Sequence, residues 1–291
     1  MSVKHPIISV TGSSGAGTTS VRNIFEQIFR REHIKPAYIE GDAFHRYDRA
    51  EMKLRMAEAE KTGNNHFSHF GLNENLLENL QATFRNYSES GTGLTRHYIH
   101  DEKEAAIHGA QPGTFTEWEQ LPAYTDILLY EGLHGAVVHG DIDIAQYADV
   151  KIGVVPVLNL EWIQKIHRDR SGRSYTTEQV METILRRMPD YVHYICPQFT
   201  QTDINFQRVP TVDTSNPFIA RWIPTADESI VVVRFRNPHG IDFPYLLSML
   251  HNSFMSRANS IAIPGNKFDL AMQLILTPVI MQLIERRNRA K

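Results

Sequence analysis

The sequence has a single cysteine, no excess of positive charge and no long uninterrupted hydrophobic run. Cys196 has no partner in the chain, so a scaffold built on internal disulfides is excluded and the cytoplasm is the expected compartment. Thirty Lys and Arg against 33 Asp and Glu leave a net charge of −3, which by bulk charge excludes a strongly basic nucleic-acid binder. The most apolar long segment, Leu270 to Ile284, is interrupted by two glutamines, a threonine and a proline. A membrane span needs about 20 largely apolar residues, and we expect none here.

The chain is long and apolar enough for a sizeable core, with 291 residues of which 42% are hydrophobic and 22% charged. It has no internal repeat and no linker-like segment, so residues 1–291 are expected to form one domain. Short apolar runs alternate with amphipathic helical patterns, which is typical of an α/β sheet, mainly parallel, with helices on its faces. The expected strands are Pro6–Val10, Ala37–Glu40, Asp126–Tyr130, Val150–Val157 and Ile230–Phe235, and the expected helices are residues 21–29, Leu158–Arg168, Thr177–Met188, Phe243–Met255 and Leu270–Arg287. The polar stretch from Asn64 to Pro122 is interpreted as an insertion that binds the acceptor.

A glycine-rich segment follows the first expected strand and opens the first expected helix. Its spacing matches the phosphate-binding loop G-x-x-x-x-G-K-[ST], except that Thr18 replaces the lysine. In this setting backbone N–H groups and the helix N-terminus cradle phosphate, and Thr19 would help to hold Mg²⁺. The residues expected to bind the phosphates of ATP are Gly12, Ser13, Ser14, Gly15, Ala16, Gly17, Thr18, Thr19 and Ser20. The alternative is a tight turn without a ligand; a dinucleotide-binding turn does not fit, because its glycine order is G-x-G-x-x-G.

A phosphate loop without its lysine needs positive charge from elsewhere to neutralise the transferring phosphoryl group. The segment 165–176 offers it, because Lys165, Arg168 and Asp169 fall on one face of a helix and Arg173 follows. Thr176 and Gln179 have the spacing of a capping box for the next helix. We interpret this segment as a basic lid over the nucleotide, and the alternative is a solvated, charged helix end.

Two acids stand where strands are expected to end. Asp42 follows the second strand and Glu131 follows the strand that ends at Tyr130. Because ligands of open α/β sheets bind at the carboxyl ends of strands, these carboxylates would lie near the phosphate loop and its Mg²⁺. Each acid taken alone is equally compatible with a helix cap or a surface position.

Basic and aromatic residues that suit an anionic acceptor accompany Asp42. His45, Arg46 and Arg49 would share its face if this segment is helical, and guanidinium groups recognise phosphate. Arg96, Tyr98 and His100 alternate, so on a strand they would lie on one side and extend the same pocket.

These motifs together resemble bacterial phosphoribulokinases of the short, proteobacterial type. The matching segments are residues 12–19, 40–46, 130–135, 159–170 and 213–218. The resemblance implies a P-loop kinase fold like that of the nucleoside monophosphate kinases, with a parallel or mixed sheet, flanking helices, insertions and a lid. It also implies ATP-dependent phosphorylation of D-ribulose 5-phosphate at its C1 hydroxyl, a step of Calvin-cycle carbon fixation.

The same resemblance implies a role for each matching residue. Asp42 would be the general base, and Thr19, Glu131 and Asp169 would serve Mg²⁺-ATP, Asp169 also being needed for the chemical step. Lys165 and Arg168 would stabilise charge in the transition state. The residues that would hold the sugar phosphate are His45, Arg49 and Arg173, with Tyr98 and His100 extending the pocket.

The resemblance further implies a homo-oligomer, commonly an octamer, and allosteric control by NADH. Control by an internal disulfide, as in plant and cyanobacterial relatives, is excluded because Cys196 is the only cysteine. Three alternatives remain open: a related kinase such as a uridine kinase with another acceptor, a phosphoribulokinase-like paralogue, or a regulatory protein that binds ATP without turnover.

Overall fold

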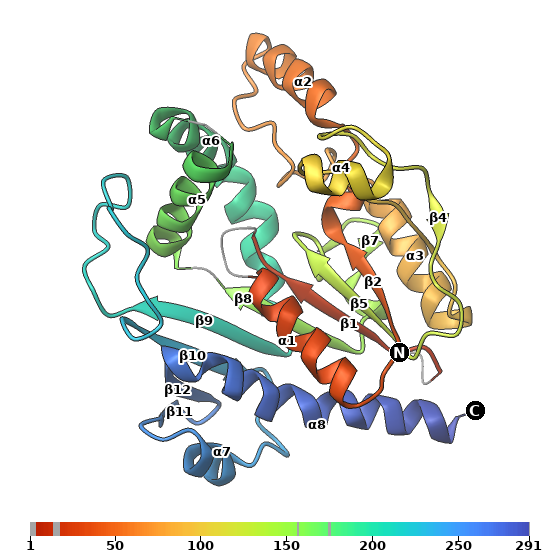
Figure 1. The fold of residues 1–291 in the computed structure, drawn as a ribbon, viewed down its shortest axis with the longest axis vertical. Coiled ribbons are helices and arrows are strands. Elements are labelled where there is room, and N and C mark those ends of the chain that lie inside the picture. The colour runs from red at the N-terminus through yellow and green to blue at the C-terminus, as the bar shows by residue number, and fades with distance from the viewer. Residues whose placement is uncertain (1–3, 14–17, 156, 174–175, 291) are drawn as a thin grey trace.

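In the computed structural model the centre of the fold is one mixed, eight-stranded sheet (Figure 1). The model describes residues 4–13, 18–155, 157–173 and 176–290, without the side chains of residues 18–20 and 171–173. The eight strands of this sheet lie in the order β11 (Phe254–Arg257), β12 (Ser260–Pro264), β10 (Ser229–Phe235), β9 (Ile204–Pro210), β8 (Val150–Val155), β1 (Ile7–Thr11), β5 (Ile127–Gly132) and β2 (Pro36–Glu40). From β2 to β9 the pairing is parallel, and from β9 to β11 it is antiparallel. The expectation of a parallel or mixed sheet is confirmed.

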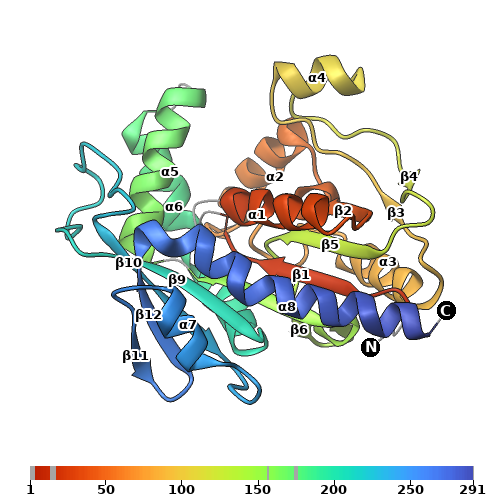
Figure 2. The same cartoon turned by 60° about the horizontal axis from the view of Figure 1, so that its bottom comes forward.

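The larger core lies between the sheet and three helices on one face, α1 (Thr18–Arg31), α7 (Phe243–Met249) and α8 (Phe268–Arg289). Residues Val21, Ile24, Phe25, Ile28 and Phe29 of α1 are all buried, as their helical spacing predicts. All five residues of β1 are also buried, as expected for a central strand covered on both faces. Figure 2 shows α8 running along the sheet beside α1.

The opposite face of β1, β5 and β2 is covered by α3 (Leu77–Ser90). Leu77, Leu80, Phe84 and Tyr87 of this helix are buried against the sheet. The region 64–122 is therefore not a separate insertion in its entirety, because α3 completes the core. Around it lie α4 (Glu102–His108) and the short paired strands β3 (Leu94–Thr95) and β4 (Glu119–Gln120).

Two groups of helices rise beyond the ends of the parallel strands (Figure 1). On one side stand α5 (Leu158–Arg173) and α6 (Thr177–Asp190), and on the other stand α2 (Arg49–Lys61) and α4. The predicted capping box is confirmed: the Thr176 side chain accepts from Gln179 N and the Gln179 side chain accepts from Thr176 N. After α6 the chain continues through a π-helical turn (Tyr191–Ile195) and a 3₁₀ turn (Cys196–Thr200) into β9.

The expected helix Phe243–Met255 is wrong in its second half. Helix α7 ends at Met249, and Asn252 has a φ of +66°, a left-handed conformation that Asn tolerates better than most residues. The chain then reverses into β11, which pairs with β12. These two strands and β9 were not expected from the sequence. A small hairpin of β6 (Val138–His139) and β7 (Ile142–Asp143) completes the described strands.

The expectation about membrane spans also needs a correction. By length and composition alone, the helix spanning Gly265–Arg289 is long and apolar enough to cross a membrane. The helix contains too few charged and polar residues for this criterion to exclude it. Six of its apolar residues are buried in the described part of the chain: Ala271, Met272, Ile275, Leu276, Ile280 and Leu283. This helix therefore forms part of the core.

Candidate active site

The ends of β1, β2 and β5 bring the glycine loop and the two predicted acids to one edge of the sheet. Glu131 is in register with Val10 of β1 and with Glu40 of β2. The Gly12 amide donates to the Gly132 carbonyl at 3.1 Å, so Glu131 lies beside the start of the loop. Ser14, Gly15, Ala16 and Gly17 lie outside the described residues, as do the side chains of Thr18, Thr19 and Ser20.

A close approach of two glycines shapes this edge. A Cβ atom on Gly132 would lie 2.6 Å from the Gly41 Cα, and a Cβ on Gly41 would lie 2.8 Å from the Gly132 Cα. Only residues without a side chain allow the two strand ends to come this near. The approach places the turn that carries Asp42 directly against the turn that follows Glu131.

Asp42 lies in a 3₁₀ turn, Gly41–Phe44, and is surrounded by histidines. One carboxylate oxygen is 3.2 Å from His45 Nε2 and the other is 3.7 Å from His100 Nε2. Burial raises the pKa of Asp42, but the charge and hydrogen bond of His45 and the charges of His100 and His69 outweigh it. The pKa of Asp42 is thus well below its usual range. The Asp42 side chain is 38% exposed, so an acceptor can reach its carboxylate.

The other residues predicted to bind the acceptor gather around Asp42. Arg49 donates from Nη2 to the His100 carbonyl at 3.0 Å. This bond uses only one of the several N–H donors of its guanidinium group. The Tyr98 ring meets His100 edge-on at a centroid distance of 4.9 Å and His45 at 6.3 Å. The side chain of Arg173 lies outside the described residues.

Two predicted members of this pocket have other partners. Asp42, His45 and Arg49 do not share one helix, because the 3₁₀ turn ends before His45 and α2 begins only at Arg49. Arg46 consequently points elsewhere and donates to the carbonyls of Asn73 and Asn75. Arg96 donates to the carbonyls of Ala43 and His45 and stacks on aromatic rings, so it supports the Asp42 turn.

On the opposite side, α5 carries Lys165, Arg168 and Asp169. Lys165 and Asp169 are buried, whereas the Arg168 side chain is 38% exposed. Lys165 Nζ is 2.6 Å from Asp169 Oδ2, and Arg168 Nε is 3.0 Å from Asp169 Oδ1. Burial raises the pKa of Asp169, but these two cations outweigh it and the pKa lies below its ordinary value. Burial and the nearby Arg187 lower the pKa of Lys165 to about 8, although Asp169 opposes them.

Sequence reasoning missed two residues of this side. Glu161 is buried one helical turn before Lys165 and accepts a hydrogen bond from the Ser13 hydroxyl, which ties α5 to the glycine loop. The signal was present, because Glu161, Lys165 and Asp169 recur every fourth residue. Arg187 of α6 acts on both sides, since its charge contributes to lowering the pKa of Lys165 and of His69. Only tertiary packing reveals that position.

Comparison with known proteins agrees with this geometry. The model of the Phosphoribulokinase / Uridine kinase family matches residues 7–215. The chain belongs to this family. Among its relatives, a protein named phosphoribulokinase from Nitrobacter vulgaris is 71% identical over 287 residues, which cover 99% of both chains. Another of that name from Xanthobacter flavus is 69% identical over 290 residues, covering 100% of both.

The fold of this chain also matches a solved structure. The phosphoribulokinase from Rhodobacter spheroides superimposes with a TM-score of 0.91 at 61% sequence identity, covering 99% of this chain and 100% of that one. The expected P-loop kinase fold is confirmed.

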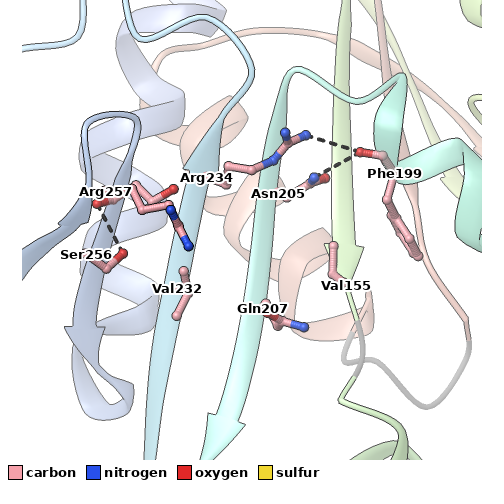
Figure 3. A pocket seen from close by; sticks show the side chains of 9 residues that line it. Val155, Phe199, Asn205, Gln207, Val232, Arg234, Ser256 and Arg257 are labelled. Carbon is pink, nitrogen blue, oxygen red and sulfur yellow. Dashed lines mark hydrogen bonds between the residues drawn. The ribbon is translucent and has the colours of Figure 1, made fainter.

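A hollow lined mainly by residues of β8, β9, β10, β11 and β12 lies on the sheet face opposite α7 and α8 (Figure 3). It has a volume of about 330 Å³ and is lined in part by Phe199, Arg234 and Arg257. Arg234 and Asn205 both donate to the Phe199 carbonyl, at 3.3 and 3.0 Å, which fixes one wall. Both arginines are available to bring positive charge to this site.

Proposed function

We propose that this chain is an ATP-dependent kinase that phosphorylates D-ribulose 5-phosphate at its C1 hydroxyl, giving ribulose 1,5-bisphosphate and ADP for Calvin-cycle carbon fixation. The observation that carries the proposal is the Asp42 carboxylate, held by His45 and His100 at the sheet edge beside the glycine loop. Similarity over the full length to proteins named phosphoribulokinase supports the choice of acceptor.

Asp42 is the general base of the proposed reaction. Its carboxylate takes the proton of the C1 hydroxyl while that oxygen attacks the γ-phosphorus, and the bond to the bridging oxygen of ADP breaks. Its ionised state and partial exposure fit this role. Arg49 and Arg173 hold the 5-phosphate of the acceptor, with His45, Tyr98 and His100 forming the pocket around it.

Lys165 and Arg168 supply the positive charge that the glycine loop lacks at Thr18. They lie on α5, whose Glu161 contacts Ser13 of the loop, so they are close to the phosphates of a bound nucleotide. Charge fixed in a buried site stabilises the transition state more strongly than the same charge in water. This arrangement supports a lid formed by residues 165–176.

The oxygen donors around the loop fit Mg²⁺. The described residues contain no group of three or more His, Cys, Asp or Glu placed to hold a metal ion. Mg²⁺ in kinase sites usually keeps several waters and is bound through one or two carboxylates and the substrate phosphates. Thr11 Oγ1 and Glu161 Oε2 are buried near the loop without a hydrogen-bond partner. Thr19 and Glu131 would hold the ion, and Asp169 would join them by releasing one of its cations. Bound Mg²⁺ neutralises phosphate charge during transfer.

We place these functions in one domain of residues 1–291. Residues 12–19 form the glycine loop, and residues 64–122 contribute the acceptor side, since His69 and His100 of that region act on Asp42 and Tyr98 contacts His45. As the compartment we propose the cytoplasm, in keeping with the lone Cys196. As the assembly we propose a homo-oligomer such as an octamer, which light scattering would measure.

An ADP-release assay with Mg²⁺-ATP tests the proposed function. Ribulose 5-phosphate, ribose 5-phosphate, uridine and no acceptor are compared at equal concentrations. Turnover confined to ribulose 5-phosphate is expected. Turnover with uridine would make the chain a nucleoside kinase, and ATP binding without any turnover would favour a regulatory protein.

We further propose that NADH activates the enzyme through the hollow of Figure 3. The guanidinium groups of Arg234 and Arg257 suit the pyrophosphate of a dinucleotide, and the Phe199 ring offers an apolar wall. Arg257→Ala should abolish activation by NADH and leave the activity without NADH unchanged. Activation that persists in this variant would place the effector elsewhere.

A further inference from the structure

Asn75 lies at the centre of the histidines around Asp42 and has no role in the mechanism described so far. It precedes α3, is only 2% exposed, and pairs with His45 in an isolated antiparallel bridge. The Leu76 amide donates to the Phe44 carbonyl at 2.7 Å and so fixes this segment against the Asp42 turn. The position of the Asn75 side chain is therefore set by backbone contacts on both sides.

The surroundings of Asn75 decide which way its amide group points. Its Nδ2 lies 2.9 Å from the His69 carbonyl and 2.6 Å from the Gly71 carbonyl. Carbonyl oxygens only accept, so the amide nitrogen and not the oxygen must face them, and the two cannot exchange places. Asn75 Oδ1 must then face His45 Nδ1, at 2.8 Å.

This orientation fixes the proton on one nitrogen of His45. Since Asn75 Oδ1 accepts, His45 Nδ1 carries a hydrogen and donates it. If the ring were neutral, Nε2 would direct a lone pair at Asp42 Oδ1, 3.2 Å away, where a carboxylate also offers only lone pairs. The contact is attractive only when a proton lies between the two atoms, so Asn75, the His45 ring and Asp42 form a chain of two hydrogen bonds.

We propose that Asn75 is a positioning residue for phosphoryl transfer: by accepting from His45 Nδ1 it holds the ring in the orientation in which Nε2 faces the Asp42 carboxylate and orients it. This inference rests on the proposed function, in which Asp42 is the base. The lone pair of Asp42 that His45 does not engage remains for the hydroxyl proton of the acceptor. The geometry is that of a base whose direction is set by a chain of two hydrogen bonds.

Other groups around the pair do not replace this chain. His69 stacks on His45 at a centroid distance of 3.8 Å and His100 approaches the second oxygen of Asp42, but among the described residues the hydrogen-bond partner of His45 Nδ1 is Asn75. His134 Nε2 contacts Asn75 Nδ2 and the His69 carbonyl. Other charged neighbours are Arg46, which donates to the Asn75 carbonyl, and Arg96, which donates to the His45 carbonyl. Further titratable or charged groups nearby are Tyr98, Tyr130, Glu131 and Arg187.

A double-mutant cycle tests the proposal. Asn75→Leu keeps the volume and removes the acceptor, and His45→Gln removes its partner. Loss of such outer contacts to a functional histidine commonly costs about 10- to 100-fold in activity. We expect Asn75→Leu to lower kcat with ribulose 5-phosphate by about that factor, with little change in the KM for ATP. In the His45→Gln background, the same substitution should cause almost no further fall in kcat.

Two further variants separate positioning from stability. Asn75→Asp keeps an oxygen for His45 Nδ1 and loses both amide donors, so it should destabilise the fold and still keep most of kcat. Thr83→Val is the matched control on α3, because it removes a buried hydroxyl that donates to the Leu94 carbonyl at 3.0 Å and should leave kcat unchanged.

Several results would overturn the proposal. These are a wild-type kcat in Asn75→Leu, or effects of Asn75→Leu and His45→Gln that multiply independently. If Asn75→Leu does not fold, Asn75→Asp decides, and a hundredfold fall in its kcat contradicts the proposal. An inactive wild-type enzyme with ribulose 5-phosphate refutes the proposed function itself, whereas an active wild type with additive variants refutes only the role of Asn75.

Discussion

Lys165 offers the sharpest test of how this enzyme compensates for the threonine in its glycine loop. Its ammonium group is 2.6 Å from Asp169 Oδ2, and the side chain is only 11% exposed. Lys165→Met removes the charge and retains most of the length and volume. The substitution therefore isolates electrostatics from packing.

Two effects of different size should follow. Loss of one preorganised charge or donor at a transition state typically costs about 10²- to 10³-fold in kcat, or about 3–4 kcal/mol. Removing one partner of a buried ion pair costs about 3–5 kcal/mol when nothing compensates. Because Arg168 remains 3.0 Å from Asp169, we expect the loss in unfolding free energy to be smaller, about 1–2 kcal/mol.

The assays are ADP release at saturating substrates, calorimetric titration with Mg²⁺-ATP, and urea unfolding. We expect kcat to fall at least about a hundredfold while the affinity for ATP changes by less than about tenfold. A second variant, Lys165→Met with Asp169→Asn, removes the poorly compensated carboxylate. It should regain stability without regaining kcat.

One result would refute this reasoning: a Lys165→Met enzyme with wild-type kcat. The compensating charge would then come from another cation, and Arg187 of α6 is the first to test, because its charge already contributes to lowering the pKa of Lys165. A fall in kcat no larger than the loss of folded enzyme accounts for would instead assign Lys165 a structural role.

Three further predictions concern the other side of the site. Asp42→Asn should lower kcat at least about a hundredfold with ATP binding intact, and unchanged turnover would remove Asp42 from the base role. Arg49→Ala should mainly raise the KM for the sugar phosphate; a change confined to ATP parameters would contradict the acceptor pocket. Burial lowers the pKa of His134 to about 4, so between pH about 6.5 and 4 the unfolded chain binds a proton that the native ring does not. Stability should therefore fall with falling pH in this window, by up to about 1.4 kcal/mol per unit, and urea unfolding of His134→Gln should show a flatter dependence; equal slopes would exclude His134.

The parallel part of the fold, apart from β9, was readable from local patterns. The strand at residues 6–10, the glycine loop and the apolar face of α1 are contiguous in sequence, so their periodicity and turn chemistry sufficed. The antiparallel part was not readable in the same way. Strands β11 and β12 are short and gain their stability from pairing with β10, and the turn at Asn252 replaces the second half of an expected helix.

The site divides along similar lines. Asp42 and Glu131 were identified because each follows an apolar strand, and the edge of a parallel sheet collects such residues. Arg46 and Arg96 were placed in the acceptor pocket because a regular helix or strand was assumed for them. The backbone instead turns after Phe44, and both guanidinium groups bond to carbonyls.

The sequence by itself predicted the chemistry proposed for this protein: a phosphate loop without its lysine, acids at strand ends, and a basic helix to supply the missing charge. These signals are local, and local spacing carries them. Only the tertiary structure decided which residues meet across elements. Ser13 with Glu161, and His45 with Asn75, are 148 and 30 residues apart, and their contacts arise from packing that no short-range pattern encodes.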